Sequence, residues 1–261
     1  MTRNPSRNGA PAAADVATYA LGLGDDVLVL AQRLSEWTAR APQLEDDVAL
    51  LNIALDLVGQ ARNLLSLAGG RQEPGRTEDD LAFWRDETEF RNAHIMELDG
   101  GDFGRTIARQ FLVSAWHVPL WGALCSSTDA ELAAIADKAV KEARYHVTYA
   151  RHWLVRLGDG TAESRRRVQA GLEEVWPYAA ELFELDPLTE RLVAAGVAPD
   201  PAVVEPVWRE AVDAALAEAT LVAPPTVRRP TGGRHGVHTS AFGPLLAQMQ
   251  HLHRSHPGAS W

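Results

Sequence analysis

Hydrophobic residues recur every three or four positions along most of this chain, which is the spacing of one face of an α-helix. The pattern predicts four long helices, at about 25–41, 44–68, 103–124 and 128–158. Shorter helices are expected at about 79–97, at 162–185 with a break near Pro177, and at 188–195, 201–220 and 241–254. No segment alternates with the two-residue period of a strand. We therefore predict an all-α fold, a four-helix bundle with additional C-terminal helices.

Capping signals suggest where the long helices begin and end. Asp25 or Asp26 is expected to be the N-cap of the first long helix, directly after a glycine. Gly69-Gly70 is a stop signal for the second helix. Thr128-x-x-Glu131 has the form of a capping box at the start of the fourth.

The second long helix carries apolar residues nearly all the way round. A helix of this kind is expected at the centre of a fold, because it has no face suited to water. We therefore predict that this helix is buried. Its apolar residues are Val48, Leu51, Ile53, Leu55, Leu57, Val58, Leu64 and Leu65.

Polar side chains nevertheless interrupt the apolar faces of all four long helices. Burying a polar group without a hydrogen bond costs a few kcal/mol, so polar residues in a core are expected to have a structural or functional role. One interpretation is a polar network that fixes the register of the helices. Its predicted members are Gln32, Asn52, Gln60, Gln110, His117 and Tyr145.

The other interpretation is a metal site, because ferritin-like di-iron proteins bind their metals at this place in the bundle. Those sites need a Glu from each of two helices and a Glu-x-x-His from each of the other two. Here the second helix reads Asp-x-x-Gly, the fourth reads Glu-x-x-Tyr, and the third has no acidic residue over 103–127. At best a single weak site remains, and the vestigial positions are Glu36, Asp56, Glu142 and His146.

Composition excludes several classes of protein. The chain has 25 basic and 35 acidic residues and a formal net charge of -10, which argues against general nucleic-acid binding. Its single cysteine, Cys125, permits no internal disulfide. Residues 1–14 lack the apolar core of a signal peptide, and we expect a disordered lead-in of a cytoplasmic protein. Residues 15–261 are then one helical domain without a membrane span.

Two basic segments stand out in this acidic chain. Arg165, Arg166 and Arg167 sit near the start of a helix, where the helix dipole disfavours cations. Residues 222–240 form a long Pro/Gly-rich basic loop that includes Arg228, Arg229 and Arg234. Each segment is either a solvated surface or a contact to an anionic partner, such as an acidic face of a neighbouring subunit.

Several stretches together resemble a known family. They are LEDDVALLNIALDLVGQARN (44–63), TIARQF (106–111), AWHV (115–118), KEARYH (141–146) and TGGRHGVHT (231–239). They are similar to the C subunits of the bacterial ring-epoxidising phenylacetyl-CoA oxygenases, which are ferritin-like proteins with a degenerate di-iron site. The resemblance covers about residues 15 to 261.

The resemblance implies a role that spacing and composition do not. It implies a structural, non-catalytic subunit in aerobic phenylacetate degradation, which supports a homologous A subunit that holds the di-iron centre. Electrons would come from NADPH through a reductase with FAD and an iron–sulfur cluster, and this chain would hold no cofactor. The anionic partner of the two basic segments would then be a neighbouring subunit or the phosphates of the CoA thioester. Two alternatives stay open: a ferritin-like oxidase that binds iron by itself, and a stand-alone helical binding protein.

Overall fold

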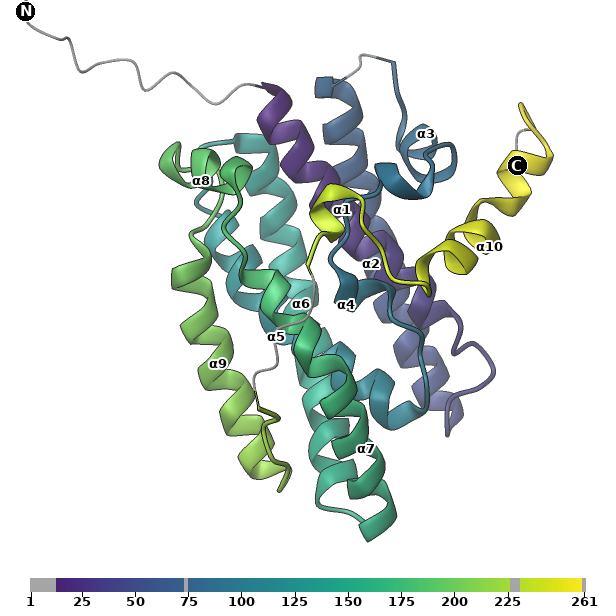
Figure 1. Cartoon of the computed structure of the whole chain (residues 1–261), viewed down its shortest axis with the longest axis vertical. Coiled ribbons are helices and arrows are strands. Elements are labelled where there is room, and N and C mark those ends of the chain that lie inside the picture. Colours follow the sequence, from purple (N-terminus) through teal and green to yellow (C-terminus); the bar gives the residue numbers. More distant parts are fainter. Residues whose placement is uncertain (1–12, 73–74, 226–230, 260–261) are drawn as a thin grey trace, which may run out of the picture.

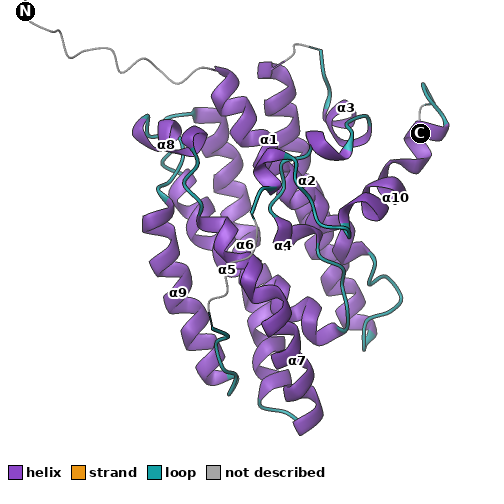
Figure 2. Cartoon of the chain, in the orientation of Figure 1, coloured by secondary structure: helices purple, strands orange, loops and turns teal. Residues whose placement is uncertain are grey.

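The computed structural model describes residues 13–72, 75–225 and 231–259. Within these residues the chain forms ten α-helices, three 3₁₀ segments and no strand, so the predicted all-α fold is confirmed (Figure 2). The α-helices are α1 (Ala13–Ser35), α2 (Leu44–Gln72), α3 (Glu78–Phe83), α4 (His94–Glu97), α5 (Phe103–Leu124), α6 (Ala130–Gly158), α7 (Ala162–Val175), α8 (Pro187–Ala194), α9 (Pro201–Glu218) and α10 (Phe242–Ser255). The 3₁₀ segments are η1 (Glu87–Glu89), η2 (Trp176–Phe183) and η3 (Gly233–His235).

The four longest helices form a bundle of two antiparallel pairs, α1 with α2 and α5 with α6. The two pairs are joined by contacts at both ends. At one end the indole Nε1 of Trp37 donates to the Thr106 hydroxyl at 2.9 Å, and Trp153 of α6 donates to Asp46 of α2 at 2.9 Å. At the other end Arg71 of α2 forms an ion pair with Asp129 before α6. One apolar core runs through all four helices.

The later helices pack on the outside of the bundle (Figure 1). α9 lies along α5 and α6 on one side, while α10 leaves the opposite side next to α3. Trp208 of α9 is buried and donates its indole N–H to the carbonyl of Leu112 at 2.9 Å. Gly158 meets the backbone of Ala219 so closely that a Cβ there would clash. The predicted four-helix bundle with additional C-terminal helices is therefore observed.

The N-terminal helix begins much earlier than expected. α1 starts at Ala13, so Asp25 and Asp26 are not N-caps but lie fully buried in the middle of the helix. Their charges are tolerated there because Arg85 pairs with Asp25 and Arg234 pairs with Asp26. The predicted lead-in over 1–14 is wrong for its last two residues, which are helical, and the rest of it lies outside the described residues.

The helix predicted over 79–97 is three short pieces, α3, η1 and α4. Capping boxes at Thr77 and at Asp86 begin two separate segments, α3 and η1. Between η1 and α4 the backbone is held extended, because the N–H groups of Arg91 and Ala93 donate to the buried carboxylates of Asp25 and Asp26.

Two other helix ends differ from the sequence pattern in smaller ways. α6 is capped by Asp129, whose side chain accepts from the Leu132 N–H, and the Thr128 hydroxyl instead donates to the Ala195 carbonyl. The break near Pro177 is confirmed, since α7 ends at Val175 and the chain continues as η2.

α2 is not buried all the way round. One side of its N-terminal half faces solvent, and we name these exposed residues the α2 stripe: Leu44, Val48, Leu51 and Leu55. The prediction of a fully buried helix is wrong because α1 and α6 cover only the other faces. By length and composition alone α2 would also suit a membrane span, and 44% of its most apolar window is buried inside the fold.

Candidate functional site

Two side-chain pairs connect α2 to α6 midway along the bundle, and the carboxylate side chains in them, Asp56 and Glu142, are 37% and 16% exposed. The His146 ring nitrogen Nε2 lies 3.1 Å from Oδ2 of Asp56. One helical turn further along α2, the amide of Gln60 donates to Oε2 of Glu142 at 2.8 Å. The other oxygen of Glu142 faces Lys138 at 3.4 Å. The two carboxylates are thus already bound by groups of this chain.

α5 carries two further buried polar residues of the predicted network. The amide of Gln110 donates to the Ser114 hydroxyl at 2.9 Å. His117 is almost fully buried, and burial together with the nearby His146 lowers the pKa of its ring to about 3. Burial also lowers the pKa of His146, against the opposing effect of Asp56. Both rings are therefore neutral at physiological pH.

Some atoms of the central cluster have no hydrogen-bond partner in the described part of the chain. They are Oε1 of Gln60, Oε1 of Gln110, Nε2 of His117 and Nδ1 of His146, and all four are shielded from solvent. The described hydrogen bonds here are separate pairs with no shared residue, so the continuous polar network stays a prediction.

Four of the predicted site residues form no hydrogen bond to the two central pairs within the described residues. Asn52 and Tyr145 are exposed, so they are not part of the core network. Glu36 lies at the end of α1, where it pairs with Arg33 at 2.7 Å. Gln32 is half-buried on α1.

This donor set does not fit a di-iron centre. Such a centre needs four carboxylates and two imidazoles that converge on one point. Here Asp56, His146 and Glu142 are divided between two separate pairs, and Glu36 is engaged with an arginine. Within residues 13–72, 75–225 and 231–259 no three His, Cys, Asp or Glu side chains come together as metal ligands would.

The basic loop packs on its own chain, in a segment that we call the C-terminal strap (residues 231–240). Arg234 donates to Asp26 at 2.6 Å and to the carbonyls of Gly22 and Arg91. Glu181 accepts the N–H groups of Gly232 and Gly233 at 3.0 and 2.9 Å. Arg234 is therefore bonded inside the fold, with its side chain 26% exposed, and its contact to a partner or to CoA phosphates stays a prediction.

A second buried carboxylate holds the other end of the strap. Glu97 lies 2.8 Å from Nδ1 of His238 and 2.8 Å from the amide nitrogen of Asn92, and it accepts the N–H of Thr239 at 2.5 Å. Sequence reasoning missed this network and both buried aspartates of α1. The available signal was two adjacent acids inside an apolar helical pattern, together with the motif TGGRHGVHT.

The remaining predicted contacts are on the surface or outside the described residues. Arg166 and Arg167 are exposed and pair with Glu163, which lowers the pKa of that carboxyl group to about 2. Arg165 donates to the carbonyl of Gly158 at 2.7 Å. Arg228 and Arg229 lie outside the described residues.

Comparison with known proteins identifies the family. A family model described as phenylacetic acid catabolic protein matches residues 1–261. The chain belongs to this family. A relative from Escherichia coli (strain K12), the C subunit of 1,2-phenylacetyl-CoA epoxidase, is 48% identical over 246 residues, which are 94% of this chain and 99% of the relative. The resemblance drawn from the sequence motifs is confirmed, and the family match extends over the whole chain.

Proposed function

We propose that this chain is the structural, non-catalytic C subunit of a multicomponent phenylacetyl-CoA ring epoxidase that acts in aerobic phenylacetate degradation in the cytoplasm. It supports a homologous di-iron A subunit. The observation that carries the proposal is the pairing at the bundle centre, where Glu142 is bound by Gln60 and Asp56 by His146. These pairs join α2 to α6, which is a structural use of the positions that bind metal in ferritin-like enzymes.

The identity to the E. coli relative supports the placement in an epoxidase complex, since that relative is named as one subunit of an epoxidase. Under this proposal the cofactors belong to other subunits. The di-iron centre is in the A subunit, and FAD, the iron–sulfur cluster and NADPH act through the reductase.

The α2 stripe is the surface on which we place the A subunit. Its residues are 40–74% exposed and follow each other at intervals of four, three and four. That spacing gives one continuous apolar seam and is typical of packing against another helix. An isolated soluble chain rarely exposes such a seam. A homologous bundle offers helices of matching length, so a helix of the A subunit is the occupant that fits.

The non-catalytic role is tested by Glu142→Gln in the assembled epoxidase. Glutamine keeps an oxygen for the Gln60 amide but removes the carboxylate that a metal or a proton transfer would require. We expect the purified complex to keep its turnover within about twofold, because that change is close to neutral for a structural hydrogen bond.

Glu163→Gln, at an exposed carboxylate on α7, is the matched control for the same purification. A loss of turnover of about tenfold or more in fully assembled Glu142→Gln complex, corresponding to about 1.4 kcal/mol in the barrier, would show that this chain takes part in the chemistry.

A further inference from the structure

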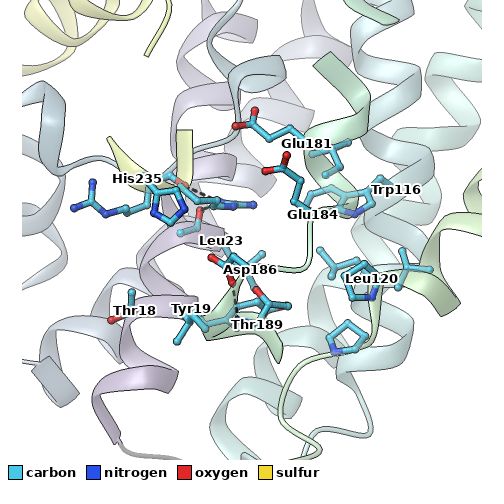
Figure 3. A pocket seen from close by; sticks show the side chains of 18 residues that line it. Thr18, Tyr19, Leu23, Trp116, Leu120, Glu181, Glu184, Asp186, Thr189 and His235 are labelled. Atoms are coloured by element: carbon cyan, nitrogen blue, oxygen red, sulfur yellow. Dashed lines mark hydrogen bonds between the residues drawn. The ribbon is translucent and has the colours of Figure 1, made fainter. Parts of the chain in front are cut away.

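A cavity of about 90 Å³ lies outside the bundle centre, between α1 and α5 (Figure 3). α1 and α5 form its inner walls, and η2, the start of α8, the start of α9 and the C-terminal strap enclose the rest. The exposed side chain of Glu184 is part of its lining, so the cavity is open to solvent at that edge. None of the residues of the two central pairs lines it.

Much of the wall is apolar. Leu23, Leu120 and Val204 are buried side chains from three different helices, and the ring of Trp116 adds an aromatic surface. One water needs about 10–15 Å³ of such space, and a cavity of about 150 Å³ holds benzene. The cavity is therefore sized for about six waters, or for a small organic molecule that reaches partly into the opening.

Two hydrogen-bonding groups on this wall have no partner within the described residues. Trp116 is 3% exposed, and its indole N–H makes no hydrogen bond to the protein. The hydroxyl of Tyr19 is likewise unpaired, and burial raises the pKa of Tyr19, so it remains a donor. Figure 3 shows Tyr19 and Trp116 on different sides of the space. Neither donor atom is among the side-chain atoms that are both unpartnered and shut off from solvent, so each faces space that a water or a ligand can enter.

Acceptors lie at the edge of the same cavity. Figure 3 shows the carboxylates of Glu184 and Asp186 among the lining side chains, and Asp186 also accepts the Thr189 N–H at 2.7 Å as the cap of α8. These two charges disfavour an anionic ligand. A cationic ligand would meet Arg91 and Arg234 in the same lining. A neutral molecule avoids both penalties.

We propose that this cavity is a binding site for a small neutral alcohol or phenol. A hydroxyl can accept from Trp116 or Tyr19 and at the same time donate to a carboxylate at the edge, and it leaves fewer unmatched donors and acceptors against the apolar wall than a larger neutral group such as an amide. The apolar part of the ligand then lies against Leu23, Leu120 and Val204.

Titration of the isolated full chain with phenol, followed by saturation-transfer NMR and calorimetry, tests this site. Benzoate and benzylammonium serve as size-matched charged probes. We expect saturable one-to-one binding of phenol, with each charged probe bound at least tenfold more weakly. Trp116→Phe keeps the ring but removes the donor, and should weaken phenol binding roughly three- to tenfold, the effect of one lost hydrogen bond. Tyr19→Phe is the second variant, should Trp116→Phe not fold.

Trp84→Phe is the matched control, because Trp84 is 43% exposed and does not line the cavity. The proposal is overturned if phenol shows no saturable binding, if benzoate or benzylammonium binds equally well, or if both foldable cavity variants bind phenol like Trp84→Phe. Because phenol binding is measured on the isolated chain, its outcome does not depend on whether the chain assembles with an A subunit.

Discussion

Replacing Arg85 with methionine is expected to lower the free energy of unfolding by about 3–5 kcal/mol, because it leaves a buried carboxylate without its counter-charge. The side chains of Arg85 and Asp25 are only 2% and 0% exposed. Nη1 of Arg85 donates to Asp25 at 2.9 Å and to the Glu89 carbonyl at 3.0 Å, and the guanidinium lies 4.1 Å from the centre of the Phe90 ring. Urea unfolding of the purified chain measures the loss.

The double variant Asp25→Asn/Arg85→Met separates the charge effect from lost packing. It should be more stable than Arg85→Met alone by about 1 kcal/mol or more, because the unpaired charge is gone. Arg151→Met is the control, since Arg151 and Glu218 form an ion pair at the surface and its loss should cost less than about 1 kcal/mol. Equal losses for Arg85→Met and Arg151→Met would contradict a structural role for the buried pair.

The double substitution Leu51→Glu/Leu55→Glu is expected to weaken binding of the A subunit by at least about 100-fold. Two carboxylates would have to be buried in the apolar seam, at a cost of several kcal/mol, and about 1.4 kcal/mol corresponds to a factor of ten in affinity. Both positions are exposed in the isolated chain, at 40% and 60%, so its own stability should change little. Co-purification and calorimetric titration with the A subunit give the affinity.

The α9 variant Val203→Glu/Val207→Glu is a closely matched control. Its positions have the same four-residue spacing on another helix and are 65% and 52% exposed. It should bind the A subunit like the wild-type chain. The opposite pattern, with assembly lost in the α9 variant and kept in the α2 variant, would place the interface on α9.

The helical periodicity was sufficient to predict the bundle, because each long helix buries an apolar face against its neighbours. It did not predict the start of α1. Adjacent Asp25 and Asp26 are a reasonable N-cap signal when only local sequence is considered. Their partners Arg85 and Arg234 are distant in sequence, and only the tertiary fold shows that both charges are neutralised. Periodicity also does not say which apolar face of α2 stays uncovered.

In the candidate site too, some residues could be predicted from helical spacing and others could not. The spacing on α2 and α6 correctly placed Gln60, Glu142 and His146 near the bundle centre, since residues four apart share one helix face. It could not separate Asn52 from them, because a small rotation of α2 turns that residue to solvent. The pairing of Arg234 with Asp26 was not predicted for another reason: a basic residue in a Pro/Gly-rich loop gives no sign that the loop folds back onto α1.

The iron content of this chain, purified alone and then with its co-expressed A subunit, tests the proposed structural role most directly. The separate carboxylate pairs at the bundle centre predict iron near zero for the isolated chain, and about two irons per heterodimer once the A subunit is present. Glu142→Gln should leave the second value unchanged. Stoichiometric iron on the isolated chain, lost in the Glu142→Gln variant, would contradict the account and make this subunit a metal-binding protein itself.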